Sequence, residues 1–207
     1  MIVKVCGMRE AENIRAVEAL GVDWMGFIFW ESSSRYVSQH PDYLPMRAKR
    51  VGVFVDAPLD VVHQQVEAFG LDVVQLHGSE SPTYLRDLRD ALGNGASIVK
   101  AFSIANRDDL SQTSLYEGMA DYYLFDTKAQ LVGGNGRKFD WSVLVYYNGS
   151  TPFLLSGGIG PDDASHISVF RHPQLAGIDL NSRFEIAPAK KNVELLKQFL
   201  YEIQQNQ

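Results

Sequence analysis

The chain has 207 residues and one cysteine, Cys6, which stands in the stretch VKVCGM directly before a glycine. A thiolate can act as a base or a nucleophile, whereas a protonated thiol in a core is only a small apolar group. Because one cysteine forms no intrachain disulfide, its use fits a reducing compartment. Cys6 is therefore either a packing residue or a reactive group, and the residues placed around it must decide.

Other groups that could do chemistry follow short apolar runs further along the chain. They are Asp56, Gln75, His77, Asp126, Ser156, Gly157, Gly158, Asp179, Asn181 and Ser182. Gln75 and His77 are two residues apart, so on a strand both side chains face the same way. Considered one at a time, about half of these residues could be explained by helix capping or tight turns alone. These two explanations do not account for Cys6, His77 and Asp126 together.

The elements that must position these groups are short β-branched runs alternating with segments of helical spacing. We predict strands at 2–6, 24–29, 51–55, 73–77, 98–102, 122–126, 153–157 and 176–180. The runs are apolar throughout, which is typical of parallel strands covered on both faces. Helical segments are expected at 58–70, 81–92, 107–117, 140–147, 161–170 and 191–203, and Ser81 is the expected N-cap of the second.

Eight strands at this spacing, alternating with helical segments of which six are identified above, predict an α/β fold, a (β/α)₈ TIM barrel of near-minimal length with eight helices, and residues 1–207 as a single domain. An open doubly wound sheet is the alternative, but it has about five or six strands and would leave some of these runs unused. In a barrel, function gathers at the carboxyl ends of the strands. The polar residues named above lie at these strand ends.

Two loops near the end of the chain suggest a phosphate site. SGGIGP follows the seventh run and NSRFE follows the eighth, and paired small-residue loops at these places form the usual phosphate site of the barrel. The glycines could instead serve tight turns alone. A third stretch, VGGNGRKFDW (132–141), lacks the spacing of a P-loop. We expect it to close over a substrate, with Gly133, Gly134 and Gly136 supplying mobility.

Bulk properties exclude some partners. The formal net charge is −6 and no basic block is present, which argues against nucleic acid. No apolar run approaches the ~18 residues that span a bilayer, and the chain opens directly into a strand-like run rather than a signal peptide. We therefore expect a cytoplasmic protein with no membrane partner.

Seven segments of the chain resemble the phosphoribosylanthranilate isomerase family of tryptophan biosynthesis. They are KVCGM, GFIFWESSSRYV, VGVFVD, VVQLHGSE, FDTKAQLVGGNGRKFDW, LSGGI and GIDLNSRFE. The resemblance runs from residue 3 to about residue 192. Its most specific parts are the K-x-C-G start, the QLHG strand end and the D…GG-x-G…FDW block.

The resemblance implies an Amadori rearrangement of N-(5-phosphoribosyl)anthranilate that needs no cofactor and no metal. The general base of the family falls on Cys6 and the general acid on Asp126. Substrate binding would fall on Arg35 at the anthranilate carboxylate, Asp179 at the sugar hydroxyls, Gln75, His77, and, around the phosphate, Gly157, Gly158, Asn181 and Ser182. The substrate is thus a small phosphosugar–anthranilate, and both a monomer and a homodimer stay open.

The chemistry sets an expectation for each protonation state. Positive charge or N–H groups near Cys6 should lower the pKa of its thiol, because only the thiolate is a useful base. Burial or a nearby phosphate should keep the proton on Asp126.

The chain departs from the family pattern at several loop positions. Ser34 replaces the proline before the arginine, and GGNGR with Asn135 replaces GGTGK. Arg183 replaces the glycine after the N-S pair and adds a positive charge near the expected phosphate. The stretch P-A-K-K-N (188–192) replaces P-G-x-K-D. These changes affect loop geometry and remove no chemical group.

Three other functions are weighed against this one. A metal-dependent epimerase needs clustered histidine and aspartate ligands, whereas only His77 ends a strand. An indole-glycerol-phosphate synthase needs a lysine and a glutamate, and Lys100 is available for it. A barrel that only binds a phosphorylated ligand would have no need of both Cys6 and Asp126.

Overall fold

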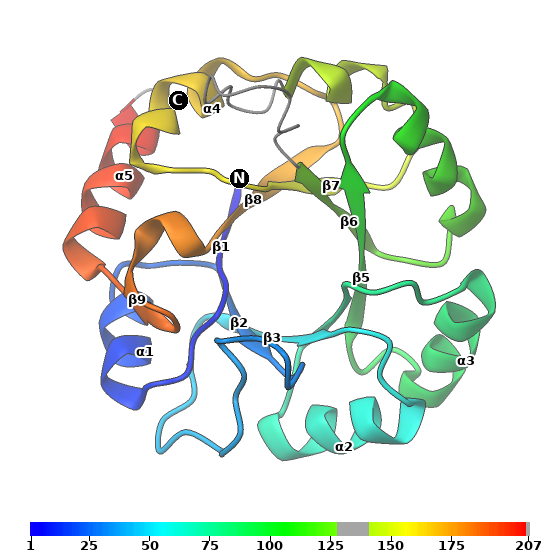
Figure 1. The fold of residues 1–207 in the computed structure, drawn as a ribbon, viewed down its shortest axis with the longest axis horizontal. Coiled ribbons are helices and arrows are strands. Elements are labelled where there is room, and N and C mark those ends of the chain that lie inside the picture. The colour runs from blue at the N-terminus through cyan, green and yellow to red at the C-terminus, as the bar shows by residue number, and fades with distance from the viewer. Residues whose placement is uncertain (128–140, 206–207) are drawn as a thin grey trace.

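The computed structural model describes residues 1–127 and 141–205. Within them, eight parallel strands close into a barrel in chain order, with β8 pairing back to β1 (Figure 1). The strands are β1 (Ile2–Val5), β2 (Trp24–Ile28), β3 (Lys49–Phe54), β4 (Val73–Leu76), β5 (Ser97–Ile104), β6 (Tyr122–Thr127), β7 (Phe153–Ser156) and β8 (Leu175–Leu180). The predicted barrel is confirmed, and each predicted strand is found to within two residues at either end.

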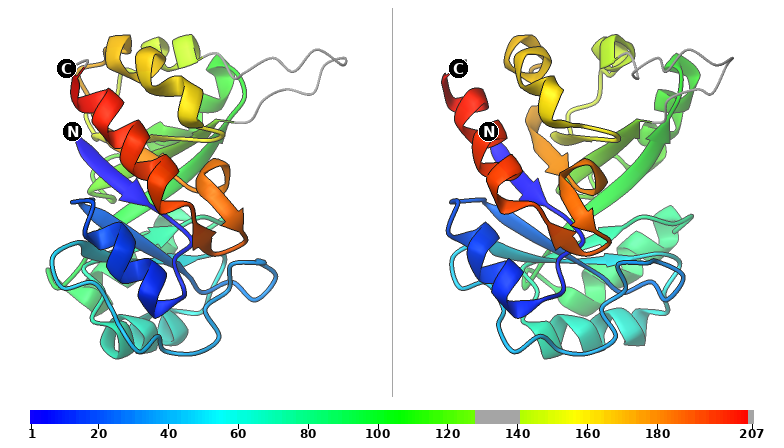
Figure 2. Two further views of the ribbon diagram at one scale, coloured as in Figure 1. Left: turned by 90° about the vertical axis from the view of Figure 1, so that its left-hand side faces the viewer. Right: turned by 60° about the vertical axis from the view of Figure 1, so that its left-hand side comes forward.

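Helical segments surround the barrel (Figures 1 and 2). They are α1 (Ala11–Glu18), α2 (Leu59–Phe69), α3 (Pro82–Leu92), α4 (Ala164–Val169) and α5 (Val193–Gln205), with the 3₁₀ segments η1 (Arg107–Tyr116), η2 (Trp141–Tyr146), η3 (Pro161–Asp163) and η4 (Ser182–Phe184). None of these described helices is long and apolar enough to cross a membrane.

The prediction of eight helices alternating with eight strands is wrong between β2 and β3. Residues 29–48 form turns and irregular chain there. Prolines 41 and 45 and the serines at 32–34 explain this, because proline removes a helical donor and serine competes for the backbone. The segments around 107–117 and 140–147 are helical as predicted, but they are wound as 3₁₀.

Local signals set the helix ends. Ser81 accepts a hydrogen bond from the Tyr84 amide at 3.2 Å and Pro82 occupies the first turn of α3, so the predicted N-cap is confirmed. Asn192 caps α5 by accepting from the amide of Leu195 at 3.1 Å. Gly70 ends α2 in the left-handed conformation, with φ of 56°.

Two apolar layers stabilise the barrel. The outer layer lies between the strands and the helices and includes Phe27, Phe54 and Phe125. The inner layer fills the barrel with Val51, Val53, Val73, Val99, Ala101, Leu124, Leu154 and Trp24, and it includes Cys6. Because side chains alternate along a strand, the polar residues two positions beyond these inner ones point into the mouth of the barrel.

A short hairpin follows β8 and was not predicted. Its antiparallel strands are β9 (Glu185–Ala187) and β10 (Lys190–Lys191), and the turn places Ala189 at φ of 65°. Asn13 of α1 accepts from the Lys191 amide at 2.8 Å and donates to the Lys191 carbonyl at 3.0 Å. These two bonds fix the hairpin against α1, beside the carboxyl end of β1.

Candidate active site

A cavity of about 400 Å³ opens where the carboxyl ends of the strands meet. Of the predicted site residues, those that line it are Cys6, Gln75, His77, Asp126, Gly157, Gly158, Asp179, Asn181 and Ser182. They arrive from β1, β4, β6, β7 and β8, so the closure of the barrel alone brings together residues far apart in sequence. Arg35 is the predicted site residue that does not line the cavity.

The wall of the cavity also contains residues that the sequence analysis did not select. Ile28, Trp30, Val53 and Val55 form an apolar side at the ends of β2 and β3, and Ile159 lines the cavity from the loop after β7. An apolar wall of this kind can receive an aromatic ring. Apolar residues at strand ends look like core residues in sequence, which is why no pattern distinguished them.

Cys6 is nearly buried, with 4% of its surface exposed. Its sulfur lies against β2, because a Cβ built on Gly26 would stand only 2.7 Å from Sγ. Burial raises the pKa of the Cys6 thiol, and the nearby ammonium groups of Lys4 and Lys191 oppose this. Burial prevails, so the expected lowering of this pKa is wrong for the structure described.

A buried ion pair lies directly beneath Cys6. Lys4 and Asp179 are partners in the register of β1 and β8, and Lys4 Nζ is 2.8 Å from Asp179 Oδ1. Ser156 donates to the other oxygen of Asp179 at 3.2 Å. Burial alone would lower the pKa of Lys4, but Asp179 and Cys6 together raise it, so Lys4 stays protonated. A fixed cation thus stands on the same face of β1 as the thiol.

Gln75, His77 and Asp126 form a second polar group on the other side of the cavity. Gln75 Nε2 is 2.8 Å from His77 Nδ1, and His77 Nε2 is 3.5 Å from Asp126 Oδ2. The histidine and aspartate side chains are each about one third exposed, at 33% and 31%. Gln75 Oε1 is buried without a hydrogen-bond partner among the described residues.

Arg35 takes part in an ion network above the cavity rather than in its wall. Its Nε and Nη2 atoms both donate to the Glu185 carboxylate, with Nη2 2.6 Å from Oε2. Lys191 Nζ donates to Glu185 Oε1 at 2.6 Å and to Asn181 Oδ1 at 2.8 Å. Burial alone would raise the pKa of Glu185, but the two cations lower it below its usual value.

The same network packs on the residue after the cysteine. A Cβ on Gly7 would lie 2.7 Å from Arg35 Cδ and 2.8 Å from Asn181 Oδ1, and φ of Gly7 is 74°. Only glycine fits this position without displacing both neighbours. Glu185 and Lys191, which the sequence analysis missed, therefore support both the thiol and Arg35.

The loops after β7 and β8 lie together, as predicted. Gly157 and Gly158 have φ of 92° and 67°, a conformation that glycine adopts without strain. They share the cavity wall with Ser182 and with Arg183, which replaces the glycine of the family pattern. The predicted mobile loop with Gly133, Gly134, Asn135 and Gly136 lies outside the described residues.

Two candidates serve other purposes. Lys100 Nζ is 2.9 Å from Glu80 Oε2 and 2.7 Å from the Gly78 carbonyl, in a pair whose side chains are 4% and 1% exposed. This ammonium lines an adjoining hollow that shares His77 and Asp126 rather than the cavity with Cys6, and its pairing with Glu80 argues against the synthase alternative. Asp56 accepts from the Ser79 amide at 2.7 Å and so fixes the loop after β4.

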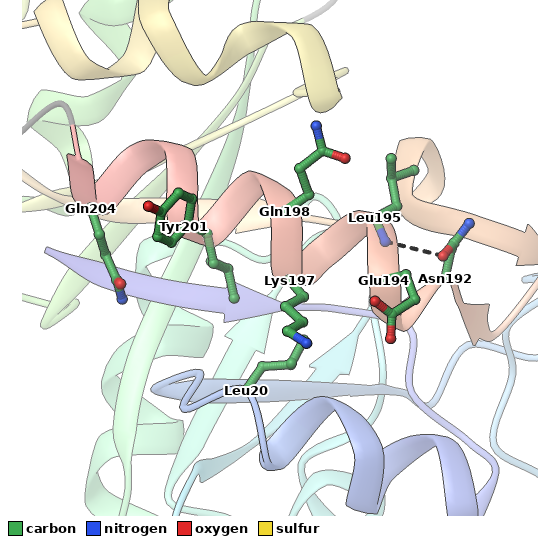
Figure 3. Close-up of a pocket in the computed structure, with 9 residues that line it drawn as sticks. Leu20, Asn192, Glu194, Leu195, Lys197, Gln198, Tyr201 and Gln204 are labelled. Carbon is green, nitrogen blue, oxygen red and sulfur yellow. Dashed lines mark hydrogen bonds between the residues drawn. The ribbon is translucent and has the colours of Figure 1, made fainter.

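A larger hollow of about 670 Å³ lies on the outer surface along α5 (Figure 3). Its lining includes Leu20, Lys197, Gln198 and Tyr201. None of the predicted site residues lines it, and the Asn192 cap of α5 closes one end of it. The site is therefore assigned to the smaller cavity at the strand ends.

Comparisons with known proteins identify the family of this chain. A family model described as N-(5'phosphoribosyl)anthranilate (PRA) isomerase matches residues 3–202. N-(5'-phosphoribosyl)anthranilate isomerase of Phocaeicola vulgatus is 50% identical over 99% of this chain and 98% of its own length. The protein of that name from Parabacteroides distasonis is 49% identical over 98% of this chain and 93% of its own length.

Solved structures give the same result. Phosphoribosyl anthranilate isomerase from Thermotoga maritima superposes with a TM-score of 0.82 at 28% identity, covering 99% of this chain and 100% of its own. A complex of such an isomerase with reduced 1-(o-carboxyphenylamino)-1-deoxyribulose 5-phosphate gives a TM-score of 0.80 at 27% identity, with coverage of 99% and 100%. The chain belongs to the N-(5'-phosphoribosyl)anthranilate isomerase family.

Proposed function

We propose that this chain converts N-(5-phosphoribosyl)anthranilate to 1-(2-carboxyphenylamino)-1-deoxyribulose 5-phosphate by an Amadori rearrangement, in tryptophan biosynthesis. One observation carries the proposal. Cys6, Asp126 and the paired loops after β7 and β8 line a single cavity, whose other wall is apolar. This combination suits a substrate with a phosphate, a sugar and an aromatic ring. The chain would act on it in the cytoplasm.

Asp126 is the general acid and Cys6 the general base in this proposal. Asp126 gives its proton to the ribose ring oxygen, and the bond from that oxygen to C1 breaks as the nitrogen lone pair forms a C1=N bond. Cys6 then takes the proton from C2, and the released electron pair forms an enolamine. C1 takes a proton from the thiol and the enol hydroxyl returns one to Asp126, so the ketone forms with no net oxidation.

The positions of the two groups suit these steps. Cys6 follows β1 and Asp126 ends β6, and these strands stand on opposite sides of the barrel (Figure 1). A sugar between them can be protonated from one side and deprotonated from the other. The raised pKa of Cys6 means that the thiolate is a minor species at neutral pH, and Lys4 and Lys191 provide the positive charge that supports it.

The remaining residues bind the substrate in this proposal. Gln75, His77 and Asp179 would contact the sugar, and the loops with Gly157, Gly158, Asn181 and Ser182 would hold the phosphate. Arg35 would bind the anthranilate carboxylate. Glu185 occupies the Nε edge of its guanidinium, so the remaining Nη1–Nη2 edge would receive that carboxylate.

The test is an activity assay on freshly made phosphoribosylanthranilate. Turnover is followed as the loss of anthranilate-type fluorescence, with and without a chelator. We expect rapid turnover that the chelator does not change. The proposal is wrong if the intact, folded chain leaves the substrate unchanged at the rate of the buffer blank.

A further inference from the structure

Every lysine and arginine described so far around the cavity contacts a carboxylate, with one exception among the described residues. Lys4 pairs with Asp179, and Arg35 and Lys191 share Glu185. Arg183 also lines the cavity, yet it makes no ion pair with any of the described residues. An unpaired cation in the wall of a cavity favours an anionic ligand.

The position of Arg183 identifies the part of the ligand that it faces. Arg183 belongs to η4, directly after Asn181 and Ser182 at the end of β8. Its guanidinium reaches the neighbouring loop, because a Cβ built on Gly160 would lie 3.2 Å from Nε and 3.6 Å from Nη2 of Arg183. The side chain thus spans the gap between the loop after β8 and the loop after β7.

These two loops are the ones assigned to the phosphate above. Gly157 and Gly158 present their backbone to the same cavity, and they carry no side chain that could neutralise a dianion. A guanidinium fork matches the oxygens of a phosphate with two parallel charge-assisted hydrogen bonds. The family pattern has glycine at this position, so the guanidinium is a group that this chain adds to the loop.

We propose that Arg183 is a phosphate-binding residue of this chain and that its guanidinium pairs with the phosphate group of the substrate. The proposal rests on the proposed function for the identity of the substrate. Its own content is narrower, namely that this side chain recognises a phosphate dianion beside Gly157 and Gly158. It can therefore be tested by phosphate binding as well as by turnover.

The experiment compares Arg183→Gln and Arg183→Gly with the intact chain. Titration calorimetry gives the dissociation constant for inorganic phosphate, and the fluorescence assay gives KM and kcat. We expect both variants to raise the phosphate dissociation constant and KM by about tenfold, because a charge-assisted contact is lost. We expect kcat to stay within about twofold, because the charge of the phosphate does not change during the reaction. Arg183→Lys should recover part of the loss.

Arg86→Gln is the matched control. Arg86 is exposed on α3 and lies outside the cavity. The control substitution therefore removes the same charge without changing the proposed phosphate site. The proposal is overturned if Arg183→Gln binds phosphate like the intact chain, or if it lowers kcat at unchanged KM and unchanged phosphate binding. Loss of phosphate binding in a chain without turnover would support Arg183 and reject the isomerase function, so the two failures are distinct.

Discussion

Nε2 of His77 lies 3.5 Å from Oδ2 of Asp126, so the proposed general acid stands beside an imidazole. The ring can serve Asp126 in two ways, and Gln75 sets which one applies. With Gln75 Nε2 donating to Nδ1, the neutral ring presents Nε2–H to the carboxylate. With the amide turned over, Nδ1–H donates to Oε1 and Nε2 faces the carboxyl group as a hydrogen-bond acceptor. A protonated Asp126 fits the second arrangement, and an ionised Asp126 fits the first.

Replacing His77 tests this relationship. We expect His77→Ala to lower kcat about tenfold to a hundredfold, because Asp126 loses the neighbouring ring that orients its carboxyl group toward the substrate. KM should change less. A steady-state measurement of kcat and KM across pH checks this, and the shape of the kcat profile should change with the variant. A change in KM alone would show that His77 only binds substrate.

The raised pKa of Cys6 predicts how the reactivity of its thiol depends on pH. The thiolate is the form that an alkylating agent attacks, so a higher pKa leaves less of it at any given pH, and the alkylation rate should rise as pH increases. The rise should continue past the ordinary value for a thiol, about 8.5, before it levels off. A pH profile of the rate of alkylation by iodoacetamide in the absence of substrate measures this. A plateau already reached by pH 7 would contradict the raised pKa.

Gly26 makes room for the sulfur of Cys6. A methyl group there would come within 2.7 Å of Sγ, so we expect Gly26→Ala to displace the thiol and to reduce kcat at least tenfold. The fold should survive with a modest loss of stability, which circular dichroism and a melting curve would show. Gly95→Ala is the control, since it lies in a turn outside the cavity. An active Gly26→Ala enzyme would show that the thiol need not keep this place.

Glu185 pairs with two cations, Arg35 and Lys191, in the ion network beside the cavity. Its side chain is 6% exposed, so we expect Glu185→Gln to destabilise the protein by about 3 kcal/mol, because Arg35 and Lys191 would keep their charges without a partner. Urea unfolding at pH 7 measures this. Glu10→Gln is the control, since the Glu10–Lys190 pair is about half exposed and should contribute less than about 1 kcal/mol.

The same carboxylate gives stability a pH dependence. The pKa of Glu185 is lowered in the folded state, so its contribution is present above the unfolded value, about 4.3 for glutamate, and is lost as pH falls through the lower folded value. The difference in unfolding free energy between the intact chain and Glu185→Gln should therefore shrink below about pH 4. A difference that stays constant from pH 7 to pH 3 would show that the ion network is not its source.

The sequence predicted the barrel because β-branched runs and their spacing are local signals. It also predicted the rim residues, since Gln75, His77 and Asp126 stand directly at strand ends. The ion network could not be predicted in this way, because Arg35 and Glu185 are 150 residues apart. They meet only through the closure of the barrel and the hairpin of β9 and β10.

The direction of the Cys6 pKa shift was also beyond the sequence. Cations near the thiol were expected and are present at Lys4 and Lys191, but burial opposes them and is the larger effect. Whether the pKa of the thiol is raised or lowered by these opposing effects depends on how deeply the sulfur is buried. That depth is set by packing against β2 at Gly26, which no spacing in the sequence reports.

The central claim is that Cys6 and Asp126 divide the base and acid steps, and one comparison tests it most directly. Cys6→Ser and Asp126→Asn are each assayed for turnover of phosphoribosylanthranilate and for binding of the reduced product analogue. We predict that each substitution lowers kcat by at least a hundredfold while the analogue binds within about threefold of the intact chain. Turnover by either variant within tenfold of the intact chain, with the fold preserved, would contradict the assignment.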